Sequence, residues 1–235
     1  LLYRLFGVQA ELLIDHAWGW EPCTIAAIKD YRPKSSSLSS GQVLPEPYPH
    51  EKARLIVREM ADQLSLELVE KGLVCSQFVL DIGYDAENLS APAQQRSYHG
   101  LTKTDRYGRA VPAAAHGSAN LSVPASSARI LMQTAAEVFD RIADSRLSVR
   151  RVTVTAAGLL RQEVAQLVGG DQLDFFGNYA AHQQQKAELE RELSGQQAIV
   201  ALRKKYGKNA VLRGMDLQEG ATTKNRNGQI GGHKA

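Results

Sequence analysis

Apolar residues recur every three or four positions in two stretches of the chain, and this spacing predicts two amphipathic helices. The first helix begins after Pro49 and stops at Gly72. Its apolar stripe consists of Ala53, Ile56, Val57, Met60, Leu64 and Leu68. The second helix is capped by Ser126 or Ser127 and ends near Asp144. Its apolar stripe consists of Ile130, Leu131, Ala135, Val138, Phe139 and Ile142.

Alternation of apolar and polar residues predicts four strands around these helices. The first is a serine-rich segment, residues 34–44, which Pro45 closes, and the second is residues 78–84. Residues 116–123 and 149–160 form the third and the fourth. The order β-α-β-β-α-β is that of ferredoxin-like folds, so we expect an α+β domain whose four-stranded sheet is covered on one face by two helices. The other face of the sheet is then free for a partner.

Four parts are expected along the chain. Residues 1–32 form a helical remnant and a tether, and residues 33–160 form the ferredoxin-like domain. Residues 161–177 form a linker, and residues 178–235 form a helix followed by a basic tail. Because the chain starts at Leu1 inside an apolar helical pattern, without an initiator Met, we expect it to be a fragment of a longer protein.

The C-terminal part is rich in Gln, Glu and Lys and has few apolar positions. This composition predicts a largely solvent-exposed helix that is weakened at Gly195. The tail after Gly220 either follows a nucleic acid or is a disordered, solubilising segment.

Composition permits one globular core with extensions and does not by itself indicate a partner. The 235 residues are 43% hydrophobic and carry a formal net charge of +3, which allows nucleic-acid binding without requiring it. Cys23 and Cys75 lack the spacing of a metal site and are expected as free thiols. No segment has the roughly 18 consecutive apolar residues of a membrane span, and the N-terminus lacks the layout of a signal peptide. We therefore expect a soluble, cytoplasmic protein.

No arrangement of residues in the sequence indicates catalysis or metal binding. Histidines without a nucleophile or ligand partner at useful spacing are His16, His50, His99, His116, His182 and His233. Carboxylates expected at solvated helix positions are Glu59, Asp62, Glu137 and Asp140. Asp81 and Asp85 flank a strand end. We expect neither catalytic residues nor metal ligands in this chain.

Basic and small polar residues gather around the predicted uncovered face. The basic residues are Arg32, Lys34, Arg96, Lys103, Arg106, Arg109, Arg150 and Arg151. The small polar residues, Ser35 to Ser40 and Gly41, supply hydroxyls and open backbone, which hydrogen-bond phosphate oxygens without reading base identity. The alternative is a merely solvated basic loop. Because the strands offer too few exposed aromatic residues for base stacking, recognition of a nucleic-acid backbone is favoured.

Five segments of the sequence form a recognisable set: YRPKSSSLSSGQVL, HEKARLIVREMADQL, FVLDIGYD, HGSANL and VRRVTVTA. They resemble the little-finger domain of Y-family translesion DNA polymerases of the UmuC and DinB type, the ImpB/MucB/SamB-like proteins. ELLIDHAWGWEP is similar to the end of the family's thumb domain, and ATTKNRNGQIGGHKA to its C-terminal end, so the resemblance covers nearly the whole chain.

This resemblance implies a little finger that packs in the major groove of duplex DNA and contacts both phosphate backbones. The residues that match the family's strand facing the template backbone are Lys34, Ser37, Ser40, Gly41 and Gln42. Arg150 and Arg151 match the basic opening of its last strand. Arg96, Lys103 and Arg109 are added as DNA contacts from their charge alone.

The stretch QLDFF, residues 172–176, resembles the family's clamp-binding peptide. In this interpretation Gln172 is the hydrogen-bonding head, and Leu173 and Phe176 are anchors that enter a pocket on a bacterial sliding clamp. Asp174 occupies a position where the family has a small or acidic residue, and Phe175 departs from the common leucine. The alternative is that both phenylalanines fold back onto the domain.

The resemblance implies the DNA-binding C-terminal part of an error-prone DNA polymerase, acting in translesion synthesis, DNA repair and the SOS response. The carboxylates that hold Mg²⁺ for nucleotidyl transfer belong to the palm, upstream of the thumb, so this chain is expected to hold no cofactor and not to polymerise alone. Expected partners are primer-template DNA and a bacterial sliding clamp, with polymerase accessory subunits as further candidates and no membrane. The alternative from another class is a non-catalytic, ferredoxin-like nucleic-acid-binding adaptor.

Overall fold

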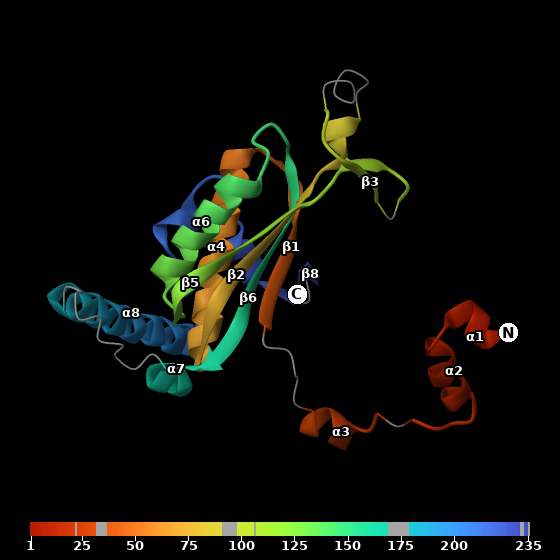
Figure 1. The fold of residues 1–235 in the computed structure, drawn as a ribbon, viewed down its shortest axis with the longest axis horizontal. Coiled ribbons are helices and arrows are strands. Elements are labelled where there is room, and N and C mark those ends of the chain that lie inside the picture. The colour runs from red at the N-terminus through yellow and green to blue at the C-terminus, as the bar shows by residue number, and fades with distance from the viewer. Residues whose placement is uncertain are drawn as a thin grey trace. The chain divides into compact units, whose positions relative to one another are not determined.

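In the computed structural model, residues 1–21, 23–31, 37–90, 98–105, 107–168, 179–230 and 233–234 are described. The chain divides into two compact units, Leu1–Ser35 and Ser36–Ala235. The first unit contains the short helices α1 (Leu2–Phe6), α2 (Gln9–Ala17) and α3 (Ile25–Asp30) (Figure 1). Of its described residues, Ala10 alone is buried. This unit therefore lacks a core of its own within the chain.

The second unit is built on a four-stranded antiparallel sheet. Its strands lie in the order β1 (Ser37–Tyr48), β6 (Val149–Arg161), β2 (Leu73–Tyr84) and β5 (Ala115–Ala125). Helices α4 (His50–Glu70) and α6 (Ala128–Ile142) cover one face of this sheet (Figure 1). The expectation of an α+β domain with the order β-α-β-β-α-β and two helices on one face is confirmed.

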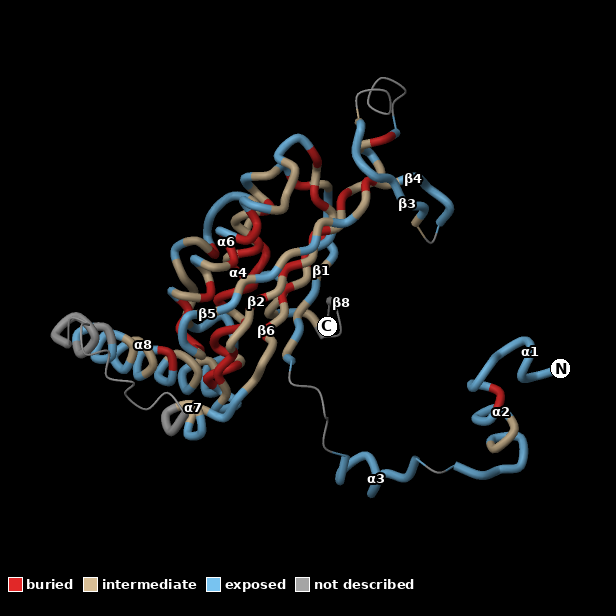
Figure 2. The backbone as a smooth tube through the Cα atoms, viewed as in Figure 1, coloured by how far each residue is buried: buried red, intermediate tan, exposed pale blue. Residues whose placement is uncertain are grey.

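The core lies between the sheet and these two helices (Figure 2). Its fully buried large side chains include Ile56, Met60, Leu64, Phe78, Leu80, Ile82, Leu131 and Phe139. Along β2 the even-numbered positions from Phe78 to Tyr84 are buried and the odd-numbered ones are not, as period-two alternation predicts. Each large side chain contributes about 1.5–3 kcal/mol by leaving water. The sheet thus has one apolar face and one open face.

The local signals for the helix ends are also found in the structure. The Ser127 hydroxyl accepts a hydrogen bond from the Ile130 N–H at 3.2 Å and caps α6. Gly72 follows the end of α4 and has a φ of 63°, in the left-handed region that a Cβ disfavours. Both positions therefore set the limits of the helices that cover the sheet.

The predicted end of the first strand is wrong. β1 does not stop at Pro45 but continues through Pro47 to Tyr48. Its register with β6 shifts between Val43 and Tyr48, so the prolines lie where the ladder is already interrupted. β1 is an edge strand, which pairs with a neighbour on one side alone, and proline, which lacks a backbone N–H donor, is tolerated in such strands.

Helix α8 (Tyr179–Tyr206) runs through Gly195 and packs against α4. Among its described residues most are exposed, as expected, but Gln196 is only 3% exposed and donates to the Ser65 hydroxyl and the Ser126 carbonyl at 3.2 and 3.1 Å. One turn earlier, Glu192 accepts hydrogen bonds from the Ser127 hydroxyl at 2.6 Å and from the Arg129 N–H at 2.9 Å. These contacts explain why the helix is not interrupted at its glycine.

The expectation that Glu59 and Asp62 are solvated is wrong, since each is 1% exposed. Residues 207–228, called the C-terminal strap below, pack over the side of α4 that carries both carboxylates. The strap contains the short helices η2 (Gly214–Leu217) and α9 (Thr223–Arg226). Amphipathic patterning places a residue on a helix face, but it does not indicate that a distant polar segment covers that face.

Candidate nucleic-acid interface

The open face of the sheet consists of four rows of side chains that cross the strands. The strand register aligns Ser37, Ala157, Gln77 and Asn120 in one row and Ser39, Thr155, Val79 and Ser118 in the next. The following rows are Gly41, Thr153, Asp81 and His116, and then Val43, Arg151 and Gly83. No position in these rows is Phe, Tyr or Trp, His116 is the one ring among them, and most positions carry hydroxyls, amides or no side chain.

Hydrogen bonds across the strands hold the polar side chains of this face in place. The Thr155 hydroxyl donates to the Ser39 hydroxyl at 2.9 Å, and the Gln77 amide donates to Asn120 Oδ1 at 3.0 Å. A face of this kind can donate to phosphate oxygens, and the imidazole of His116 is the one ring in its rows on which a base could stack. The sequence analysis identified the residues that the first strand contributes to this face. It missed those of the other strands, although apolar–polar alternation within each strand could have identified them: Thr153, Thr155, Gln77, Asn120 and Ser118.

Arg151 is the cation of the open face. Its side chain is exposed, and its cross-strand neighbours are Val43 and Gly83. A Cβ at Gly83 would lie 3.1 Å from the Arg151 Cβ, so the glycine leaves the space that the arginine stem occupies. Arg151 is therefore placed to reach an anion over the face.

Arg150 does not share this position. The register passes from Gly83 opposite Arg151 to Tyr84 opposite Val149, so Arg150 is the additional residue of a β-bulge. Its Nε lies 3.5 Å from Asp85 Oδ2, and that carboxylate is largely covered. The two arginines that the sequence placed together thus have different surroundings.

The residues expected on the first strand also divide into two sets. Ser37 and Gly41 lie on the open face, and a Cβ at Gly41 would be 3.1 Å from the Thr153 hydroxyl oxygen. Ser40 and Gln42 pair with the core residues of β6 and point to the covered side. Ser40 Oγ accepts from Arg226 Nη2 at 3.2 Å, and Gln42 Nε2 donates to the Thr222 hydroxyl at 3.2 Å. In this structure, Ser40 and Gln42 contact the chain's own strap.

One carboxylate lies in the middle of the open face. Asp81 Oδ1 is 2.7 Å from His116 Nδ1, and both side chains are about half exposed or more. The sequence pattern alone predicts Asp81 beside a strand end and gives His116 no partner. Cross-strand register, which brings them together, is not visible in single-strand periodicity.

The segment between β2 and β5 carries a small hairpin, β3 (Thr102–Thr104) and β4 (Ala110–Pro112). Lys103 lies in β3 and is exposed. Arg109 bonds Asp105 through its Nε at 2.9 Å, and its guanidinium lies 5.3 Å from the Tyr107 ring centre. The backbone N–H of Arg109 and then its side chain hold the pKa of Asp105 below its usual value. The charge of Arg109 is thus largely matched within the hairpin.

Some of the expected site residues lie outside the described part of the chain. These are Arg32, Lys34, Ser35, Ser36, Arg96, Arg106, Gln172, Leu173, Asp174, Phe175 and Phe176.

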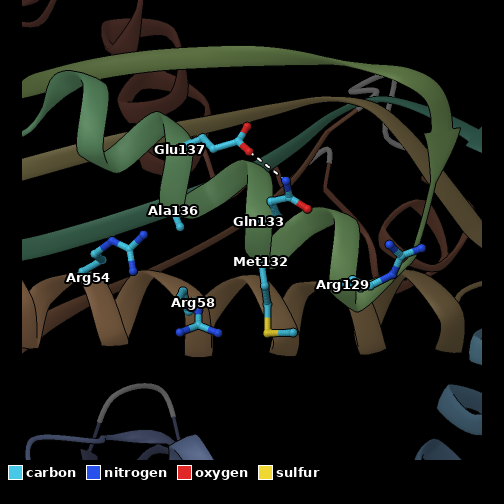
Figure 3. A pocket seen from close by; sticks show the side chains of 7 residues that line it. All are labelled: Arg54, Arg58, Arg129, Met132, Gln133, Ala136 and Glu137. Carbon is cyan, nitrogen blue, oxygen red and sulfur yellow. Dashed lines mark hydrogen bonds between the residues drawn. The ribbon is translucent and has the colours of Figure 1, made fainter.

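A hollow on the helical side of the domain does not form an anion site. It measures about 460 Å³ and lies between α4 and α6 (Figure 3). Arg54 bonds Asp140 through two hydrogen bonds of 2.8 and 2.9 Å, and Gln133 donates to Glu137 at 2.9 Å. Arg58 and Arg129 also line this hollow, and Arg129 Nη2 lies 3.9 Å from Glu188 Oε2, so carboxylates lie beside two of its three arginines.

In the described ranges, no helix is long and apolar enough to cross a membrane. No group of three or more His, Cys, Asp or Glu side chains that could hold a metal ion occurs among the same residues.

An antiparallel sheet with a covered apolar face and an open polar face, built in the order β-α-β-β-α-β, defines a compact α+β domain of the little-finger type. The sequence model of the impB/mucB/samB family C-terminal domain matches residues 35–169, and the chain belongs to this family, that of UmuC- and DinB-type Y-family DNA polymerases. The match includes the whole sheet and ends before α8 and the strap. No curated protein sequence was found to match the chain.

Proposed function

We propose that this domain holds primer-template DNA for an error-prone Y-family polymerase by contacting the phosphate backbone with the open face of its sheet. The observation that carries the proposal is the set of hydroxyl and amide rows around Arg151, without a Phe, Tyr or Trp side chain, in a domain of this family. Hydroxyls, amides and backbone N–H groups donate to phosphate oxygens of any sequence.

The size of the face supports this geometry. Four strands at a spacing of about 4.8 Å span about 14 Å from edge to edge. The major groove of B-form DNA is about 12 Å wide. Strand β1 with Ser37, Ser39 and Gly41 at one edge, and β5 with Ser118 and Asn120 at the other, could therefore each follow one phosphate backbone.

We further propose that residues 172–176 tether the polymerase to a bacterial sliding clamp. Support comes from the glutamine head and the apolar anchors Leu173 and Phe176 in the sequence QLDFF. The segment lies between α7 (Gln162–Val168), which follows the last strand of the DNA-binding sheet, and α8. A tether of this kind raises the local concentration of the domain at DNA that carries a clamp.

Nucleotidyl transfer itself is proposed for the palm of the parent protein, where Mg²⁺ would stabilise the developing negative charge of the reaction. The described residues of this chain include no group of three or more His, Cys, Asp or Glu side chains that could hold that ion.

The DNA-binding proposal is tested by fluorescence anisotropy with labelled primer-templates of several unrelated sequences, each titrated at increasing salt. Backbone recognition requires similar affinities for all sequences. It also requires that the logarithm of the association constant falls linearly with the logarithm of the salt concentration. Affinity confined to one base sequence, or independent of salt, would contradict it.

A further inference from the structure

The buried carboxylate of Glu59 accepts hydrogen bonds from the backbone of the C-terminal strap. Its Oε2 accepts from the Thr222 N–H at 2.9 Å, and its Oε1 accepts from the Thr223 N–H at 3.2 Å. Thr223 is the first residue of α9, so Glu59 caps the N-terminus of a helix that lies 163 residues or more away in the chain. Burial raises the pKa of Glu59, and the two N–H groups act against that rise.

A second buried carboxylate on α4 binds the preceding part of the strap. Asp62 Oδ1 accepts from Arg213 Nε at 2.6 Å, and Arg213 is held in turn by Asp216, whose Oδ2 accepts its backbone N–H at 2.7 Å. At the outer edge, Lys52 and Glu219 form an ion pair at 2.6 Å. The strap is thus attached to α4 by charged and polar groups along its length.

No apolar side chain of the strap is fully buried, although Val211, Leu212 and Met215 are partly buried. Its buried residues are Asp216, Thr222 and Thr223, while Leu217 is 70% exposed. Asp216 Oδ1 and Thr223 Oγ1 are buried without a hydrogen-bond partner in the described part of the protein. Because apolar burial is the dominant stabilising term in protein folding, a segment attached in this way can open without unfolding the core.

The strap also contacts the strand that carries part of the open face. Thr222 bonds Gln42 and Arg226 bonds Ser40, so two alternate residues of β1 are held on its covered side. Ser39 and Gly41, on the other side of the same strand, face the proposed DNA. A docked strap therefore fixes the edge strand that one phosphate backbone would follow.

We propose that the C-terminal strap is a polar latch whose docking on Glu59 and Asp62 strengthens DNA binding by fixing strand β1, and whose docking is in turn strengthened by DNA. The inference rests on the proposed DNA-binding function. Coupling between two binding events is reciprocal, so the factor by which docking tightens DNA binding equals the factor by which DNA favours docking. Glu59 and Asp62 act through the strap and are positioning residues.

The first test uses the unaltered 235-residue chain and amide hydrogen exchange. Saturating primer-template DNA should slow exchange of the Thr222 and Thr223 amides about fivefold or more. About fivefold is the lower end of the range by which two coupled sites usually change each other's affinity. The Arg129 amide, which is held by Glu192 of α8 instead of by the strap, is the internal control and should change less. Equal effects of DNA at the strap and at Arg129, or no effect at the strap, would overturn the latch.

The second test is the double variant Glu59→Gln, Asp62→Asn. The control is Glu67→Gln, which removes a carboxylate of α4 that is partly exposed and pairs with Lys71 instead of with the strap. The double variant should exchange its strap amides faster and bind DNA more weakly, by no more than the factor found in the first test, while the core amides of Leu80 and Val154 keep their rates. A variant with a mobile strap and unchanged DNA affinity would contradict the proposal. If the core amides also lose protection, the first test decides.

The two proposals can fail separately. If the unaltered 235-residue chain shows no salt-dependent DNA binding, the proposed function is wrong. Normal DNA binding with an uncoupled strap would remove the latch alone.

Discussion

Arg150 and Arg151 are adjacent in the chain, yet only Arg151 lies in a row of the open face. Arg151 stands opposite Gly83, while Arg150 is the additional residue of a β-bulge and its Nε lies 3.5 Å from Asp85. Bulges redirect side chains in this way at the ends of strands. One backbone irregularity thus separates two arginines that the sequence presents as a pair.

Charge reversal at these two positions should have unequal effects. Arg151→Glu should weaken DNA binding about tenfold for every sequence tested and reduce the salt slope by about one, because a phosphate contact is lost. Arg150→Glu should weaken binding less, since its guanidinium faces Asp85 instead of the open face. Anisotropy titrations with both variants at several salt concentrations provide the measurement. Equal losses, or a larger loss for Arg150→Glu, would place the DNA elsewhere.

Asp81 should oppose DNA binding. Its carboxylate lies in the middle of the open face, with Oδ1 2.7 Å from His116 Nδ1. Asp81→Asn removes a negative charge from that face and should tighten DNA binding about threefold at low salt, with the gain fading as salt screens it. Glu137→Gln, on the helical side, is the control and should leave the affinity unchanged. Weaker binding by Asp81→Asn would mean that the carboxylate orients a DNA contact.

The clamp peptide can be tested by calorimetry with purified bacterial sliding clamp. The unaltered chain should bind the clamp. A variant in which Gln172, Leu173 and Phe176 are all changed to Ala should not bind, because a few buried anchors dominate such interfaces. Changing Gln183, Gln184 and Gln185 to Ala in α8 is a control of equal size. If neither the parent nor the control binds the clamp, QLDFF is not a clamp-binding peptide.

The elements of the domain were predictable because each depends on local signals. The apolar stripe of α4, the Ser127 cap of α6 and the alternation along β2 each indicate an element without reference to the rest of the chain. The order of the strands in the sheet was not predictable, because β6 lies between β1 and β2 through contacts distant in sequence.

The candidate site was predicted less completely for the same reason. Charge and composition identified Arg151 and the serines of β1, but the row that joins Gly41, Thr153, Asp81 and His116 exists only once the register is fixed. The strap was missed because its attachment to Glu59 uses backbone N–H groups, which any sequence has. Polar docking of this kind leaves no hydrophobic pattern to detect.

The buried thiol of Cys75 should lower the free energy of unfolding of the domain as the pH rises into the alkaline range. Cys75 is fully buried, and its Sγ donates a weak hydrogen bond to the Ala125 carbonyl at 3.5 Å. Burial raises the pKa of this thiol to about 11 from an ordinary value of 9.0. The folded protein therefore holds the proton more tightly than the unfolded chain, which favours folding below about pH 9.

As the pH rises from about 9 to about 11, this contribution should be lost. The loss is on the order of 2–3 kcal/mol, since one pKa unit corresponds to about 1.4 kcal/mol. Urea unfolding at several pH values across this interval, compared with Cys75→Ala, is the measurement. The variant should be less stable at neutral pH because it leaves a small cavity, but its stability should fall less steeply above pH 9. Parallel curves for the two proteins would show that the buried thiol does not control the alkaline limit.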